Sequence, residues 1–255
     1  MFVEEKSAKP HRKFMLKRFV ILFCLFTLCQ PSLAAKTDWA ETEGGAMRLV
    51  MTRDGIGPAR GVLQIRLEPG WKTYWRDPGD GGIPPSLVGK GMAVEFQFPA
   101  PVRINENGSV FSGYHDGVSL PFVLPEALVP LEKLTAFIGV CSDICVPFQA
   151  EFPLGIDEND AAIVDAAFAK LPKPAGPNEG IASISRDGKT LVLKPALPNS
   201  ELFLAPEQGV YLSVPEAMPA GFTVKILKEK TPSVKVHYTL KTGGEALSGS
   251  FEMPK

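Results

Sequence analysis

The sequence predicts an all-β protein in which a β-sandwich is followed by a connecting helix and a second, small β domain. Three observations lead to this prediction. Short apolar strands separated by turn residues recur over residues 36–155, a spacing typical of a sandwich. A single stretch, 157–171, has helical periodicity, and a proline- and glycine-rich linker follows at 171–180. Further strand-like segments extend from that linker to the end of the chain.

Residues 1–35 have the composition of a secretory signal peptide. Lysines and arginines precede a short apolar run at 19–28, and small residues flank a cleavage point at 32–34. The run is well short of the about 20 residues that cross a bilayer, and an uncleaved anchor is the alternative. We therefore expect export to a bacterial envelope, loss of Cys24 and Cys29 on cleavage, and no membrane span afterwards.

The strands of the first domain are expected from alternating apolar and polar residues. Such alternation predicts a hairpin over 46–68. Trp71 is interpreted as a core residue, and the segment 76–86 (RDPGDGGIPPS) predicts a loop without regular structure, because proline and glycine dominate it. Further short strands are expected at 94–98, 110–114, 118–124, 134–141 and 145–154.

The last two of these strands hold the two cysteines that remain after cleavage. Ser142, Asp143 and Ile144 form a three-residue turn between them, which makes 134–154 a hairpin with Cys141 and Cys145 at its end. Residues opposite each other in an antiparallel pair have Cα atoms about 4.5 to 5.5 Å apart, within the about 4.4 to 6.8 Å of a disulfide. In one continuous strand they would be about 13 Å apart. The hairpin therefore predicts a Cys141–Cys145 disulfide.

The small size of the ring that this disulfide closes favours a redox role. A ring of about five residues stabilises a fold by about 2 kcal/mol in the chain-entropy model, against about 4.7 kcal/mol for a loop of about a hundred. A small ring beside Pro147 is also prone to strain, and strained or exposed disulfides are the exchange-active kind. The alternatives are a purely structural bridge and a metal site.

Neither a cofactor nor a metal is expected. A structural zinc site needs four nitrogen or sulfur ligands, and the candidates are Cys141, Cys145, His115 and His237, the last in what looks like another domain. Copper(I) accepts soft thiolates and stays open on ligand count. The net charge of −1 and the absence of a basic stripe with interleaved aromatics argue against nucleic acid as a partner.

Three segments together resemble a known family: GWKTYWRDPGDGGIPPSL at 70–87, GYHDGVSLPFVLP at 113–125 and GVCSDICVPFQAEFPL at 139–154. They resemble the periplasmic N-terminal (alpha) domain of DsbD- and ScsB-type thiol:disulfide interchange proteins. The resemblance covers about 36–155. It implies an immunoglobulin-like β-sandwich whose cysteine pair carries reducing equivalents. It also implies that Cys145 meets the partner and that Cys141 closes the resting disulfide.

The sequence departs from the DsbD pattern in two respects. DsbD has a longer cysteine spacing and a cap loop with acidic residues and an aromatic. Here the corresponding region, 104–111 (INENGSVF), offers only Glu106 and Phe111 as loose candidates. DsbD also continues into a membrane conduit and a thioredoxin-like domain, whereas no thioredoxin-type CxxC occurs in this chain. We therefore expect a separate membrane or thioredoxin-like electron donor.

Two other residues, His115 and Asp143, have weaker functional interpretations. His115 lies near a turn, where it is either a base for thiol ionisation or, as we favour, a solvated turn residue. Asp143 lies between the cysteines, where its charge would raise a thiol pKa, although aspartate is also a good turn former.

The second half of the chain carries no chemistry that the sequence distinguishes. A hairpin signal at 186–188 is followed by strand-like segments at 202–204, 210–214, 222–227 and 234–240. Docking or support is the expected role. The predicted divisions are a signal peptide at 1–35, a DsbD-alpha-like sandwich at 36–155, a helix and linker at 156–177, and a second β domain at 178–255.

Two functions from different classes follow. The first is a soluble periplasmic thiol-disulfide exchange protein, with protein-disulfide reductase-like activity, whose Cys145 attacks a partner disulfide before Cys141 resolves the adduct. Its partners would be periplasmic thiol/disulfide proteins. The second is a non-catalytic periplasmic binding or adaptor protein with a structural disulfide, for which copper is the candidate ligand.

Overall fold

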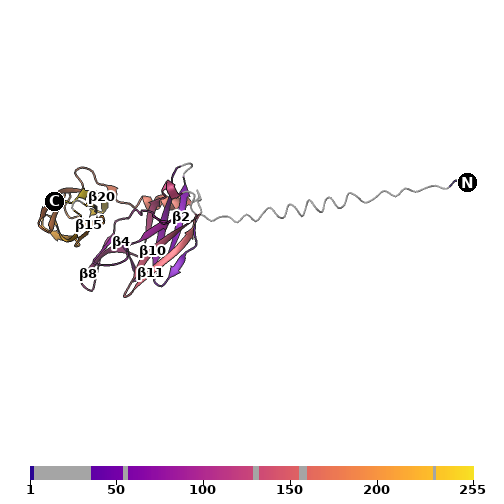
Figure 1. Cartoon of the computed structure of the whole chain (residues 1–255), viewed down its shortest axis with the longest axis horizontal. Helices are drawn as coiled ribbons and strands as arrows, with labels where there is room; N and C mark the ends of the chain where they lie inside the picture. Colours follow the sequence, from indigo (N-terminus) through magenta and orange to yellow (C-terminus); the bar gives the residue numbers. More distant parts are fainter. Residues whose placement is uncertain (3–35, 54–56, 129–131, 155–159, 232–233) are drawn as a thin grey trace. The chain divides into compact units, whose positions relative to one another are not determined.

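The structure is a computed structural model that describes residues 1–2, 36–53, 57–128, 132–154, 160–231 and 234–255. Most of the predicted signal peptide at 1–35, with Cys24 and Cys29, lies outside the described residues. Ala34–Lys255 forms one compact unit. The regular structure of this unit is mostly β-strand (Figure 1), so the predicted all-β class is confirmed.

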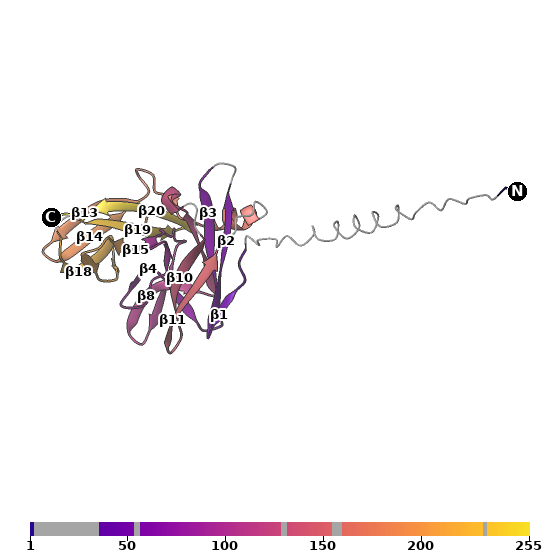
Figure 2. The same ribbon diagram turned by 45° about the vertical axis from the view of Figure 1, so that its right-hand side comes forward.

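The first sandwich consists of two antiparallel sheets. One sheet has the strand order β1-β2-β3-β9 and the other has the order β6-β5-β10-β4-β8-β7, with β11 added beside β10. Figure 2 shows β10, β11, β4 and β8 in one layer. The first sheet contains β1 (Ala40–Thr42), β2 (Gly45–Arg53), β3 (Ala59–Leu67) and β9 (Gly117–Val123). The second contains β4 (Lys72–Gly79), β5 (Ser86–Gly89), β6 (Met92–Ala93), β7 (Val102–Glu106), β8 (Ser109–His115), β10 (Lys133–Cys141) and β11 (Cys145–Pro153).

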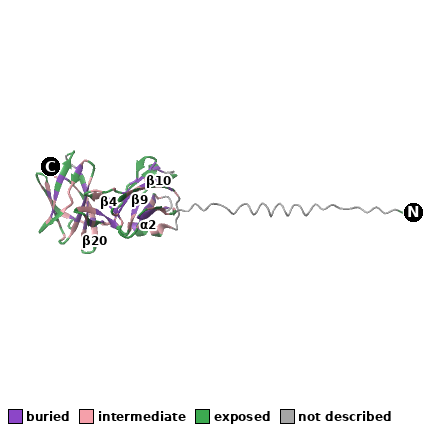
Figure 3. Cartoon of the chain, turned by 90° about the horizontal axis from the view of Figure 1, so that it is seen from below, coloured by how far each residue is buried: buried purple, intermediate pink, exposed green. Residues whose placement is uncertain are grey.

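The core of the first sandwich lies between these two sheets. Side chains alternate between the two faces of a strand, so the apolar residues of each strand reach the core at every second position. Met47 and Leu49 of β2 meet Ile138 and Val140 of β10 in this core, and each is at most 1% exposed. Figure 3 colours the chain by burial, with the buried residues in purple.

The single α-helix of the described residues covers the outer face of the first sheet, and a short 3-10 helix, η1 (Glu126–Leu128), follows β9. Helix α2 (Ala161–Phe168) packs Val164 and Ala167 against Val50 and Val62 of β2 and β3. The predicted helix is therefore confirmed in type but is shorter than 157–171, and the residues proposed to begin it lie outside the described residues.

The second sandwich follows α2 and has its own buried cluster of side chains. One of its sheets has the order β12-β20-β19-β15, and the other has the order β13-β14-β18-β16 with β17 beside β18. Its strands are β12 (Lys173–Pro174), β13 (Ile181–Asp187), β14 (Thr190–Pro195), β15 (Glu201–Pro206), β16 (Val210–Leu212), β17 (Glu216–Met218), β18 (Gly221–Glu229), β19 (Lys235–Thr242) and β20 (Glu245–Glu252).

Three local expectations from the sequence are wrong. Residues 94–98 form no strand, because Phe96 makes only one bridge, to Phe122, although its side chain is buried in the core. The segment 76–86 is not free of regular structure, because β4 continues to Gly79. The linker likewise contains β12, which pairs in parallel with β20.

Candidate functional site

The two cysteines lie at the end of the β10–β11 hairpin, as predicted. Cys141 is the last residue of β10, Cys145 is the first of β11, and the two are directly opposite in the register. Their sulfur atoms are bonded, and their Cα atoms are 4.1 Å apart. The backbone N–H of Ser142 donates to the carbonyl of Ile144 at 2.9 Å and so closes the three-residue turn. The predicted hairpin and disulfide are both confirmed.

Cys141 and Cys145 differ strongly in their exposure to solvent. Cys141 is fully buried, with 0% of its surface exposed, whereas Cys145 is exposed. Ile144, beside Cys145, is also exposed, at 58%. The disulfide is therefore accessible from solvent on the Cys145 side.

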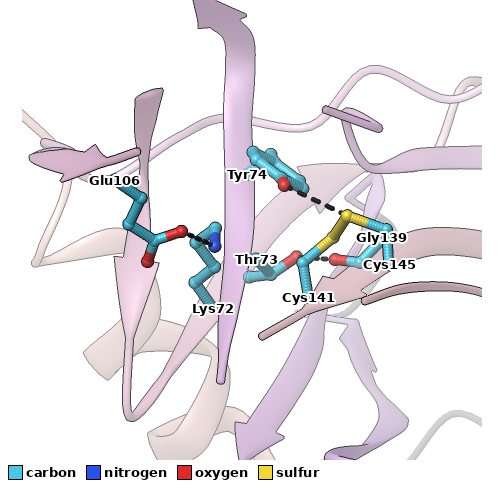
Figure 4. Close-up of a disulfide and its surroundings, with 7 residues drawn as sticks. All are labelled: Lys72, Thr73, Tyr74, Glu106, Gly139, Cys141 and Cys145. Atoms are coloured by element: carbon cyan, nitrogen blue, oxygen red, sulfur yellow. Dashed lines mark hydrogen bonds and ion pairs between the residues drawn. A yellow bond between two sulfur atoms is a disulfide. The ribbon is translucent and has the colours of Figure 1, made fainter. Parts of the chain in front are cut away.

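Strand β4 supplies the residues beneath the disulfide. Lys72 is directly opposite Cys141 in the sheet, so the two side chains lie on the same face, and Tyr74 follows two positions on. The Tyr74 hydroxyl is 3.6 Å from the Cys145 sulfur. Thr73 points the other way, and its hydroxyl donates to the carbonyl of Gly139 at 2.8 Å. Figure 4 shows Tyr74 on β4 directed at the disulfide.

Tyr74 acts as a hydrogen-bond donor to the disulfide. A disulfide sulfur carries no hydrogen, so the hydroxyl must donate in this contact. Burial of the ring, and secondarily the negative charge of Glu106, raise the pKa of Tyr74 above its ordinary value. The hydroxyl therefore keeps its proton across the neutral pH range.

The region 104–111 forms a β-hairpin. Asn107 and Gly108 form its turn between β7 and β8, and both have positive φ angles, 49° and 82°. Glu106 at the end of β7 forms an ion pair with the Lys72 ammonium group, which is nearly buried. Phe111 of β8 packs edge-on against Tyr74, with ring centroids 6.0 Å apart.

Glu106 and Phe111, the two loose candidates from the sequence, therefore contact the disulfide only through intermediate residues. Each contacts a residue of β4, Lys72 or Tyr74, which in turn lies beside the cysteines. Sequence reasoning gave no functional role to Lys72 or Tyr74. The available signal was their period-two spacing in the strand before the glycine-rich loop, which places both on one face.

The glycine-rich loop packs against the same site. A Cβ atom on Gly82 would lie 2.5 Å from the Tyr74 ring, and one on Gly139 would lie 2.7 Å from Ile83. Both glycines thus permit close contact between the loop, Tyr74 and the cysteine hairpin. The structure therefore places this loop beside the cysteine hairpin.

The remaining candidates lie at the margin of the site. His115 is exposed at the end of β8 and is opposite Lys72 in the sheet, while Asp143 is exposed at the tip of the cysteine turn. His237 lies in β19 of the second sandwich and is 3.4 Å from Glu207. Among the described residues no three His, Cys, Asp or Glu side chains cluster as metal ligands would. No helix in the described part of the chain has the length and hydrophobicity to span a membrane.

Comparisons with known proteins find a thiol:disulfide interchange family and a similar fold. Residues 50–155 match the family model described as thiol:disulfide interchange protein DsbD, N-terminal. The chain is similar to the N-terminal periplasmic domain of ScsB from Proteus mirabilis, with 22% sequence identity and a TM-score of 0.70 over 86% of this chain and 98% of that one. It also matches the full ectodomain of mouse nectin-like molecule 4, with 12% identity and a TM-score of 0.23 over 81% of this chain and 62% of that one. No curated protein matches the chain.

The likeness to the ScsB domain confirms the predicted immunoglobulin-like fold. Coverage of 86% of this chain extends well beyond residue 155, so the shared fold includes strands of the second sandwich as well as the cysteine-bearing one.

Proposed function

We propose, on the premise that residues 50–155 belong to the family of DsbD N-terminal thiol:disulfide interchange domains, that this protein passes reducing equivalents between proteins through Cys141 and Cys145. The observation that carries the proposal is the unequal exposure of the two cysteines. Cys145 is exposed and receives a hydrogen bond from Tyr74, whereas Cys141 is fully buried directly opposite it. This is the arrangement that an attacking thiol and a resolving thiol require.

The proposed reaction consists of two thiol-disulfide exchanges. In the reduced protein the Cys145 thiolate attacks a partner disulfide, so that a Cys145–partner bond forms and the other partner sulfur leaves as a thiolate. Cys141 then loses its proton and attacks the sulfur of Cys145. The intramolecular disulfide forms, the second partner sulfur leaves as a thiolate, and the partner has gained two electrons.

Tyr74 supports this reaction by stabilising the thiolate of Cys145. A hydrogen bond to the charged form of a group lowers the pKa of an acid, and the Tyr74 hydroxyl lies 3.6 Å from that sulfur. It also stabilises the same sulfur when Cys145 leaves as a thiolate, which happens when the first exchange runs in reverse and the partner disulfide re-forms.

The two electrons that leave Cys141 and Cys145 must be replaced by another dithiol. The described residues contain no other cysteine, so we assign this step to a separate thioredoxin-like or membrane electron donor. We place the reaction in the bacterial periplasm, where disulfides persist. Support for this location comes from the signal-like composition of residues 1–35 and from the periplasmic origin of the similar ScsB domain.

A redox titration of the Cys141–Cys145 pair tests the proposal directly. We expect a reduction potential in the range of about −120 to −270 mV that is typical of exchange proteins. A bridge that resists reduction below about −300 mV would identify it as structural and would favour a binding or adaptor protein instead.

Trapping experiments test the separate roles of the two cysteines. In cells that produce the Cys141→Ser variant, Cys145 should accumulate a mixed disulfide with a partner, because the resolving thiol is missing. The Cys145→Ser variant, whose remaining thiol is buried, should trap little. Non-reducing electrophoresis detects the adduct as a band that disappears with reductant. Equal trapping by both variants would contradict the assigned roles.

A further inference from the structure

Strand β11 is an outer strand that begins at the exposed cysteine. It pairs with β10 over its whole length, from Cys141 opposite Cys145 to Lys133 opposite Pro153, and in the described part of the chain it pairs with no other strand. One edge of β11 therefore carries backbone N–H and C=O groups that pair with no other described strand. The orientation of these groups follows from the register.

In an antiparallel pair, residue pairs that exchange hydrogen bonds alternate with pairs that do not. Their Cα atoms are about 5.5 Å apart in the first kind and about 4.5 Å in the second. The Cα atoms of Cys141 and Cys145 are 4.1 Å apart, which matches a pair that exchanges no backbone hydrogen bonds. The N–H and C=O of Cys145 therefore point away from β10, as do those of every second residue along β11.

Three further contacts agree with this assignment. The N–H of Leu154, an even-numbered residue, donates to the Glu132 carbonyl at 2.8 Å, so the even-numbered pairs exchange the hydrogen bonds. The Gly139 carbonyl, opposite Pro147, accepts its hydrogen bond from Thr73 on β4, and thus points away from β11. Both prolines of β11 are odd-numbered, and an outward position is where a missing N–H costs no ladder bond.

The outward edge thus has a definite composition. Cys145, Gln149 and Glu151 each present an N–H and a C=O, and Pro147 presents a C=O alone. All four residues are exposed. No backbone hydrogen bond from these outward groups to another segment is present among the described residues. The edge runs without interruption from the reacting sulfur.

We propose that this edge binds an extended segment of the partner, namely the residues flanking the cysteine that bonds to Cys145, as an added β-strand. The proposal rests on the proposed function and identifies how the partner docks. Disulfide-bonded residues have Cα atoms about 4.4 to 6.8 Å apart, and neighbouring strands are about 4.7 to 4.9 Å apart. A partner residue bonded to Cys145 is therefore within reach of the next strand position, where the outward groups can pair with its backbone.

The two prolines make this docking short and reversible. Pro147 removes one N–H donor within the edge, and Pro153 ends the run of donors after Glu151. The partner strand gains few hydrogen bonds, which suits a complex that must separate once Cys141 has resolved it. Recognition through the backbone also requires no particular side chains in the partner.

Replacing one outward N–H tests the docking edge. The probe is an extended ten-residue peptide whose single cysteine is activated as a mixed disulfide with thionitrobenzoate, and the small disulfide dithiobis(nitrobenzoate) is the reference. The reduced protein attacks both, and the released thiolate is followed by its absorbance. The comparison is between two variants that both lack the glutamine side chain. Gln149→Pro also lacks the backbone N–H, whereas Gln149→Ala keeps that N–H.

We expect the ratio of peptide rate to small-disulfide rate to be about fivefold lower in Gln149→Pro than in Gln149→Ala, the factor for one net hydrogen bond of about 1 kcal/mol. An equal ratio in the two variants would overturn the docking edge. This outcome is distinct from failure of the proposed function, which would appear in the redox titration as a bridge that resists reduction.

Hydrogen exchange on the trapped complex provides a readout that needs no change at Gln149. In the adduct of the Cys141→Ser variant with the peptide, the amides of Gln149 and Glu151 should exchange at least tenfold more slowly than in the free variant. The amides of Phe148 and Ala150, which bond to β10, are the internal control. Unchanged exchange at Gln149 and Glu151 would refute the proposal. So would protection that rises with protein concentration without peptide, which would identify a second copy of this chain as the occupant.

Discussion

At the residue scale, the contact between Tyr74 and Cys145 is the feature most directly coupled to the proposed chemistry. The Tyr74 ring is buried beneath the hairpin, and only its hydroxyl reaches the sulfur. The ring and the hydroxyl therefore have separable roles. The ring packs against Phe111, whereas the hydroxyl acts on the charge state of Cys145.

Replacing Tyr74 with phenylalanine separates these roles. In the reduced protein the Tyr74→Phe change should raise the pKa of the Cys145 thiol, because the thiolate loses a donor, and should slow alkylation at neutral pH severalfold. The pH dependence of iodoacetamide labelling measures both effects. Tyr114→Phe is the matched control, since the Tyr114 hydroxyl donates to the Pro99 carbonyl at 2.8 Å instead. An equal effect of the two changes would contradict a specific role of Tyr74.

Tyr74 and Tyr114 also predict a pH dependence of stability. Burial raises the pKa of both residues above the ordinary value near 10, with Glu106 adding to the effect at Tyr74 and Arg76 opposing it at Tyr114. In the unfolded chain these tyrosines lose their protons at lower pH than in the fold. Their contribution to stability is therefore complete below about pH 10 and is lost as the pH rises further.

Urea unfolding between pH 8 and pH 11 measures this effect. The free energy of unfolding should fall above about pH 10, and it should fall less steeply in the Tyr114→Phe variant. A slope that is unchanged by this substitution would show that other groups cause the alkaline loss.

At the element scale, the β7–β8 hairpin is joined to the site by an ion pair of unequal exposure. The side chain of Lys72 is 4% exposed, whereas that of Glu106 is 40% exposed. Removal of the carboxylate would leave the ammonium group of Lys72 nearly buried without its counter-charge. The hairpin therefore compensates a buried charge directly opposite Cys141 in the sheet.

The Glu106→Gln change should lower the free energy of unfolding by about 2 kcal/mol, between the values for exposed and fully buried pairs. The control is Glu151→Gln, which breaks the pair with Lys133 on the same sheet, where both side chains are more than half exposed. That change should cost less than about 1 kcal/mol. Urea unfolding with the disulfide intact compares the variants, and equal losses would contradict the account of Lys72.

At the scale of the whole molecule, β15 connects the two sandwiches. Its alternate side chains enter different cores, because Leu202 and Leu204 belong to the buried cluster of the second sandwich, whereas Phe203 and Ala205 belong to that of the first. The Phe203 ring packs edge-on against Trp75, with centroids 6.1 Å apart. We therefore expect the proposed domains at 36–155 and 178–255 to unfold cooperatively.

The Phe203→Ala change should uncouple the unfolding of the two sandwiches. It should cost about 3 to 5 kcal/mol, as for a buried phenylalanine, and should split a single calorimetric transition into two. Leu204→Ala, the neighbouring change directed into the second core, is the control that should destabilise without uncoupling. A single transition in Phe203→Ala would contradict this role.

Local patterns in the sequence predicted many of the strands and the cysteine hairpin. Alternating residues identified the 46–68 hairpin, and the short turn between Cys141 and Cys145 was sufficient to predict their bond, because a disulfide across a hairpin depends only on neighbouring residues. The continuous apolar run in β15 was recognised as a strand, but a run of this kind does not say which core each face enters.

Only the tertiary structure decided which residues surround the cysteines and how exposed each cysteine is. Tyr74 lies 71 residues before Cys145 in the chain, and Glu106 lies 34 residues after Lys72. Their contacts depend on the order of strands in the sheet, which brings β4 between β8 and β10. Local periodicity specifies the face on which a side chain lies, but not the neighbouring strand that it meets there. For that reason the sequence predicted a disulfide, and the fold determined that Cys145 is its accessible end.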